Sequence, residues 1–122
     1  MYQVGTAIEF DAQHIMPGVE GPEGVLHSHD YRLEVVIERE KLDDRGMVCD
    51  LDVLTGTLAE VADRVRDRDL SETCGGEAVT VEVLAAWIHE RLADPLRGDG
   101  AEVVSVRVWE SEDVFGGIRA RV

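Results

Sequence analysis

Three of the four histidines in this 122-residue chain lie between positions 14 and 29. His27 and His29 are separated by one residue, so on a β-strand both imidazoles project from the same face. His14 ends an earlier segment of alternating residues, and a hairpin of the two segments would bring the three rings together. Three imidazoles can bind zinc and leave a fourth position open for water or substrate. A His-x-His pair also arises by chance, so these residues alone leave a metal site and an accidental grouping equally open.

The two segments that carry these histidines have the alternating pattern of β-strands. Apolar residues of one parity run from Val4 to His14, which predicts a first strand. The segment at positions 16–24, MPGVEGPEG, predicts a loop because glycine and proline favour turns. A second strand follows, with His27, His29, Tyr31, Leu33, Val35 and Ile37 on one face and Ser28, Asp30, Arg32, Glu34 and Glu38 on the other.

The rest of the chain predicts two helices and two more strands. Apolar residues spaced three and four apart from Leu51 to Val65 predict a helix capped by Asp50, and Thr80 caps a second. The segment between them, SETCGGEA, predicts a loop, and His89 is expected at the helix surface. Strands are expected over 104–110 and 118–122. The ββααββ order predicts a single α+β domain over residues 1–122, with both helices on one face of an antiparallel sheet. The open edges of such a sheet favour oligomers.

The composition limits the classes of partner. A formal net charge of −14 makes nucleic acid an unfavourable partner, because like charges repel. No run of about 18 apolar residues is present, which argues against a membrane span, and the N-terminus lacks the pattern of a signal peptide. Two cysteines, Cys49 and Cys74, do not make a disulfide framework. We therefore expect a cytoplasmic protein.

Five segments in order, FDAQH, LHSHDY, GMVCDL, VTVEVLAAWI and a late WE, cover the chain from Phe10 to Glu110. Together they resemble the family of 6-pyruvoyl-tetrahydropterin synthase and 6-carboxytetrahydropterin synthase. The resemblance implies the tunnelling fold (T-fold) and a zinc ion held by His14, His27 and His29. It also implies a hexamer of two stacked trimers, with pockets between the subunits.

The resemblance also implies a substrate and the residues that bind it. Members of the family act on 7,8-dihydroneopterin triphosphate or a related pterin, and a late glutamate anchors the amino-pyrimidine edge of the ring. Glu110 matches that glutamate, and it shares the inward parity of Val104, Val106 and Val108. An exposed carboxylate at a strand end is the alternative. Thr80 matches a threonine near the pterin, although helix capping is a sufficient reason for its presence.

The chain departs from the family at the residues that transfer protons. Glu23 stands where the family usually has a cysteine, and Arg66 and Asp67 replace an Asp-His pair. A carboxylate can act as a general base when its surroundings raise its pKa. One branch of the family carries Glu at the cysteine position and cleaves the pterin side chain to 6-hydroxymethyl-dihydropterin, a retro-aldol reaction. The alternatives place Glu23 in a solvated loop and Asp67 at a solvated helix end.

These residues lead to one leading hypothesis and two rivals. We expect a zinc-dependent lyase that acts on a dihydroneopterin-type pterin, with Glu23 and Asp67 as catalytic residues and weak or absent synthase activity. The first rival is a homologue that binds zinc and a pterin without turnover. The second is an enzyme that acts on a different heterocycle in a specialised pathway.

Overall fold

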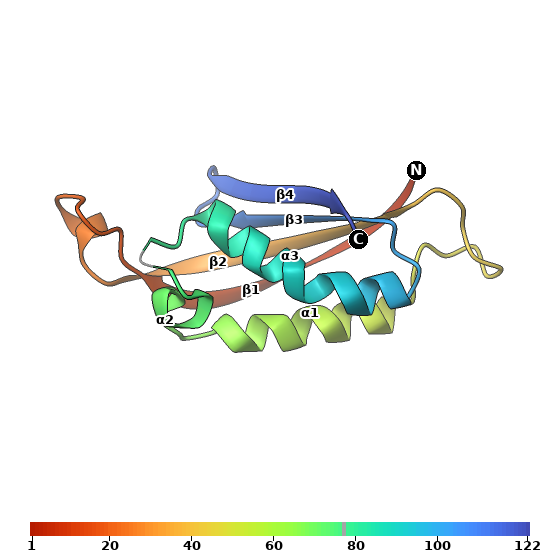
Figure 1. Ribbon diagram of the computed structural model, residues 1–122, viewed down its shortest axis with the longest axis horizontal. Coiled ribbons are helices and arrows are strands. Elements are labelled where there is room, and N and C mark those ends of the chain that lie inside the picture. The colour runs from red at the N-terminus through yellow and green to blue at the C-terminus, as the bar shows by residue number, and fades with distance from the viewer. Residues whose placement is uncertain (77) are drawn as a thin grey trace.

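A four-stranded antiparallel sheet in the order β1-β2-β3-β4 forms one layer of the protein (Figure 1). The computed structural model describes residues 1–76 and 78–122. The strands are β1 (Tyr2–His14), β2 (His27–Arg39), β3 (Val103–Trp109) and β4 (Phe115–Arg121). The predicted antiparallel α+β fold is confirmed, and β1 begins two residues before the alternating pattern that predicted it.

Two long helices, α1 (Leu51–Val65) and α3 (Val81–Gly98), form the second layer on one face of the sheet (Figure 1). Both predicted caps are present: the Asp50 carboxylate accepts a hydrogen bond from Asp52 N, and Thr80 Oγ1 accepts one from Val83 N. The loop prediction between the helices is wrong for its first part, where α2 (Leu70–Cys74) forms a short helix. Within the described residues, no helix is long and apolar enough to cross a bilayer.

The core lies between the sheet and the two long helices. It is formed by inward-facing residues of β2 and β3 and by the apolar stripes of the helices, chiefly Leu33, Val35, Ile37, Val104, Val106, Val108, Leu54, Leu58, Leu84, Ile88 and Leu92. All of these side chains are at most 2% exposed. The apolar face of the strands and the apolar stripes of the helices therefore pack against each other. This packing holds in place the strand β2, which carries two of the histidines.

His89 is buried, so the expectation that it lies at the surface is wrong. It is 8% exposed, and its Nε2 donates a hydrogen bond to Val104 O at 3.1 Å. The carbonyl oxygen can only accept, so this nitrogen carries the proton. The side chain therefore ties α3 to β3, a contact between distant segments that the position of His89 beside Glu90 did not indicate.

The segment after α1 covers the far end of β1. Asp67 N donates to Asp11 O at 2.6 Å, and Gln13 N donates to Arg68 O at 2.8 Å. Asp67 adopts a left-handed backbone conformation with φ of 58°, which turns the chain away from α1. The backbone of Asp67 thus has a structural role at the edge of the sheet.

Candidate active site

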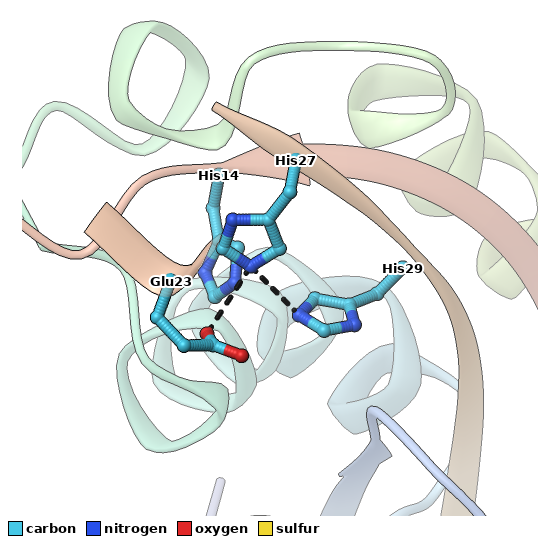
Figure 2. A group of neighbouring side chains, drawn as sticks. All are labelled: His14, Glu23, His27 and His29. Carbon is cyan, nitrogen blue, oxygen red and sulfur yellow. Dashed lines mark hydrogen bonds and ion pairs between the residues drawn. The ribbon is translucent and has the colours of Figure 1, made fainter. Parts of the chain in front are cut away.

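The β1–β2 hairpin brings the three predicted histidines together. His14 pairs with His27 and Ala12 with His29 across the two strands, on the face that the helices cover. The ring centroids lie 4.4 Å apart for His14 and His27, 4.9 Å for His14 and His29, and 4.8 Å for His27 and His29. Figure 2 shows the three rings converging beside Glu23.

Backbone carbonyls orient two of the three rings. His14 Nδ1 donates to Val79 O at 3.0 Å, and His27 Nδ1 donates to Val25 O at 2.7 Å. With the proton on Nδ1, each Nε2 presents a lone pair toward the common centre. His14 is 3% exposed, and its Nε2 is buried without a hydrogen-bond partner among the described residues. A buried nitrogen in that state is costly unless another group binds it.

Two of the distances between these side chains are close to those of a zinc site, and the four ligand atoms form one group. His27 Nε2 lies 3.1 Å from His29 Nε2 and 3.3 Å from Glu23 Oε2. One ligand atom from each of His14, Glu23, His27 and His29 lies within 4.8 Å of the others. Zinc–nitrogen and zinc–oxygen bonds of about 2.0–2.2 Å place the ligands of a tetrahedral site about 3.3–3.5 Å apart. The unpaired His14 nitrogen, the donor set and the spacing therefore all fit a zinc ion.

The surroundings favour the neutral form of His29. Burial lowers the pKa of His29, the neighbouring His14 lowers it further, and the Glu110 carboxylate partly opposes both. Glu110 Oε2 lies 4.0 Å from His29 Nε2. A neutral imidazole is the form that binds a metal.

A cavity of about 550 Å³ opens beside the histidines. Four predicted site residues line it, His14, Glu23, Thr80 and Glu110, together with Met16, Val81, Glu82, Val114, Phe115 and Gly116. Its volume is in the usual range of small-molecule sites. A second cavity of about 550 Å³ is lined by His29, Trp109 and Glu110 with seven other residues. Glu110 thus faces both cavities.

Comparison with known proteins agrees with this geometry. The model of the family described as 6-pyruvoyl tetrahydropterin synthase matches residues 3–120. The chain belongs to this family.

Its relatives in the 6-pyruvoyl tetrahydropterin synthase family are pterin-processing enzymes. A 6-carboxy-5,6,7,8-tetrahydropterin synthase from Synechocystis is 31% identical over 99 residues, 77% of each chain. A dihydroneopterin monophosphate aldolase from Pyrococcus furiosus is 34% identical over 107 residues, 88% of this chain and 87% of that one. A solved 6-pyruvoyltetrahydropterin synthase from Plasmodium vivax, with a catalytic glutamate changed to alanine, has a TM-score of 0.77 at 13% identity and covers both chains fully. That structural likeness supports the T-fold.

The fold brings six of the seven predicted site residues together, and Asp67 is the exception. Within one chain Asp67 lines a separate cavity with Asp11, Asp30 and Arg66. A hydrogen bond with Asp30 raises the pKa of Asp11 there. Within the chain, Asp67 therefore faces an acidic group of the sheet instead of the three imidazoles.

Two features of the site escaped sequence reasoning. The carbonyl groups that orient His14 and His27 belong to the backbone, so no residue type signals them. A Cβ atom at position 116 would lie 2.7 Å from Val81 Cγ2 and 2.9 Å from Glu82 N. Gly116 therefore allows β4 to begin against the N-terminus of α3, which closes one wall of the cavity. The sequence predicted this strand only from position 118, whereas β4 begins at Phe115 and includes Gly116.

Proposed function

We propose that this member of the 6-pyruvoyl tetrahydropterin synthase family is a zinc-dependent lyase that cleaves the side chain of a dihydroneopterin-type pterin by a retro-aldol reaction. The observation that carries the proposal is the position of Glu23. Its carboxylate lies 3.3 Å from His27 Nε2, and it lines one cavity with Glu110 and Thr80. The residues proposed as base, ring anchor and metal ligand therefore line one space.

The residues divide into those that hold the metal and those that hold the ring. His14, His27 and His29 would hold the zinc ion. When bound, the zinc supplies Lewis acidity and lowers the pKa of a hydroxyl group on the substrate side chain. Glu110 would accept two N–H bonds from the amino-pyrimidine edge, as a carboxylate can with both of its oxygens. Thr80 lines the same cavity as Glu110 and would limit the lateral movement of the ring.

Glu23 would move the proton. Its carboxylate accepts the proton of the hydroxyl on the second side-chain carbon, and that carbon becomes an aldehyde. The bond between the first and second carbons breaks, and its electron pair passes to the first carbon and into the ring C=N bond. The proton then returns to the first carbon. The products are 6-hydroxymethyl-dihydropterin and a two-carbon hydroxyaldehyde, so the step balances without an oxidant or reductant.

Two relatives support a glutamate-dependent cleavage. The Pyrococcus furiosus relative is named as an aldolase acting on dihydroneopterin monophosphate. The Plasmodium vivax neighbour shows that a T-fold protein can use glutamate as its catalytic residue. The usual synthase reactions are less favoured, because Glu23 replaces the cysteine and Asp67 replaces the histidine.

We also propose that the protein acts in the cytoplasm as a hexamer of two stacked trimers. Because Asp67 lies outside the histidine group of its own chain, it can assist Glu23 only at a site shared between subunits. Light scattering during size-exclusion chromatography checks the assembly, and monomeric active protein would exclude a role for Asp67.

A second function, binding without turnover, is favoured by one observation. The histidines, Thr80 and Glu110 surround the site, whereas Asp67 lies apart from it. In this case zinc and the pterin bind and no bond breaks.

The experiment that separates these functions is a product assay with zinc-loaded protein. Dihydroneopterin and its monophosphate are incubated with wild type, Glu23→Ala and Glu20→Ala, and 6-hydroxymethyl-dihydropterin is measured by mass spectrometry. We expect wild type and Glu20→Ala to release it, and Glu23→Ala to be slower by about 100-fold or more, as for loss of a general base. Pterins that bind to all three proteins and are never consumed would rule out the lyase.

A further inference from the structure

Glu23 occupies the position of a fourth ligand. Its Oε2 and the Nε2 atom of His29 lie 3.3 Å and 3.1 Å from the same atom, His27 Nε2. These two distances are close to the edge lengths of about 3.3–3.5 Å in a tetrahedral zinc site. Figure 2 shows the carboxylate turned toward the space between the rings.

The chemistry of the contact requires a positive charge between the two atoms. Because His27 Nδ1 donates to Val25 O, the neutral ring presents a lone pair at Nε2, and the carboxylate also presents lone pairs. Two acceptors at 3.3 Å repel each other unless a proton or a metal ion lies between them. A proton on His27 would exclude zinc from the histidine group, whereas a metal ion satisfies all four side chains at once.

We propose that Glu23 is the fourth ligand of the resting metal site and that the substrate displaces it, so that one carboxylate serves first as ligand and then as base. The role of Glu23 as a ligand rests on the geometry of the four side chains. Its later role as a base rests on the proposed function. In the resting protein the metal has no open position. The base is released only when hydroxyl groups of a substrate take its place.

Glu23 is the ligand best suited to leave. The three histidines belong to regular strands, and their side chains are buried or half-buried. The Glu23 side chain is 56% exposed and comes from the short 3₁₀ turn Pro22–Gly24 in the β1–β2 loop. Among the described residues its carboxylate makes one ion pair, with His27.

The backbone keeps the displaced carboxylate close to the site. Met16 N donates to Glu23 O at 2.9 Å, which ties the turn to the start of the loop that follows β1. A Cβ atom at position 24 would collide with Val19 O, so Gly24 allows the loop to fold tightly at this point. Only side-chain rotations are needed to move the carboxylate between a metal and a substrate hydroxyl.

Cobalt provides a spectroscopic probe of this ligand. Co²⁺ is bound to the metal-stripped full-length protein, and the visible spectrum and the affinity by chelator competition are measured. We expect Glu23→Gln to weaken binding of Co²⁺ and Zn²⁺ by about 10–100-fold and to change the spectrum. The matched control is Glu20→Gln, which makes the same change in the same loop and is expected to behave as wild type.

A gain of signal comes from Glu23→Cys. A thiolate that reaches the metal adds a sulfur-to-cobalt charge-transfer band in the near ultraviolet, and we expect that band with affinity near that of wild type. Adding neopterin to wild-type Co²⁺ protein should then change its spectrum, and the same addition should reduce the band of the Cys variant.

Two results would overturn the inference. One is wild-type metal affinity and spectrum in Glu23→Gln, and the other is the absence of the thiolate band in Glu23→Cys. Failure of the proposed lyase gives a different pattern, in which the ligand signals are present and no pterin is cleaved.

Discussion

The two ends of the β1–β2 hairpin each gather polar side chains, and they do so in opposite ways. At the end near the N-terminus, Gln3 Nε2 donates to Glu38 Oε1 at 2.9 Å and Arg119 Nε donates to Glu38 Oε2 at 2.7 Å. Glu38 is on the polar face, as its parity predicts, yet it is only 5% exposed. At the other end, three imidazoles and Glu23 converge, with one ligand-capable atom of each within 4.8 Å of the others.

The difference separates a cluster that stabilises the fold from one that is built to bind. Both oxygens of Glu38 have donors supplied by this chain, so nothing further is needed. His14 Nε2 has no such partner within the described residues and is fully desolvated. An unsatisfied buried nitrogen costs free energy of folding, about 1–3 kcal/mol. The cost is present at the histidine end of the hairpin and absent at the Glu38 end. This contrast indicates that the histidine end binds a ligand.

The largest effect that tests this contrast is loss of a histidine from the metal group. We expect His29→Ala to weaken zinc binding by on the order of 100-fold, since a share of about 3 kcal/mol per ligand is lost. The metal-free variant should unfold within about 1 kcal/mol of the metal-free wild type, because His29 is only half-buried. Chelator competition measures the zinc affinity, and urea denaturation measures the stability of the metal-free protein. Unchanged zinc affinity would contradict the assignment of this end of the hairpin as a binding cluster.

His89 tests the opposite case, a histidine whose bonding is complete. His89→Ala should lower the free energy of unfolding by about 2 kcal/mol, because it removes a buried ring and leaves Val104 O without its donor. Zinc affinity should stay as in wild type. Denaturation of the metal-free protein measures the first effect, and a large change in zinc affinity would show that the two histidine classes are coupled.

Thr80 has both a structural contact and a place in the candidate site, since it caps α3 and lines the cavity. Thr80→Ala should cost about 1 kcal/mol of stability through the lost bond to Val83 N. Thr80→Ser keeps the hydroxyl and should restore most of that stability. Thermal melting of both variants measures the capping contribution, and neopterin titration measures the contribution of Thr80 to pterin binding. Equal loss of pterin affinity in Thr80→Ala and Thr80→Ser would point to the methyl group as the contact.

The smallest expected effect concerns Glu38 and depends on pH. The bonds with Arg119, and then with Gln3, lower the pKa of Glu38. Their stabilisation is present above the unfolded pKa of about 4.3 and is lost as the pH falls through the lower folded value. Glu38→Gln should therefore reduce stability at pH 7 by about 0.5–1 kcal/mol and differ less from wild type near pH 3. Urea midpoints across this range measure it, and a gap that widened in acid would contradict it.

Residues close in sequence were predicted best. The hairpin parity placed His14, His27 and His29 on one face, and the apolar spacing located α1 from Leu51 to Val65. These patterns are local, because each side chain's direction follows from its own strand or helix.

The placements of His89 and Asp67 did not follow from local patterns: His89 was wrongly expected at the surface, and the catalytic role of Asp67 stays a prediction. His89 is buried by a hydrogen bond to a strand 15 residues further along the chain. The position of Asp67 depends on a hydrogen bond from its backbone N–H to Asp11 O. Comparing residue types with a family motif does not reveal such a backbone contact. Tertiary contacts decide both, and they override the local reading.

The β1–β2 hairpin also has a consequence for folding energetics. All four ligand-capable residues lie within positions 14–29, so they stay near one another even in the unfolded chain. The unfolded state would therefore keep some affinity for the proposed zinc ion. Metal binding would then raise the melting temperature by less than the affinity of the native site implies, because only the difference in affinity between the two states contributes. During synthesis, the same hairpin emerges before either long helix, so a metal ion would have its ligands before the core has formed.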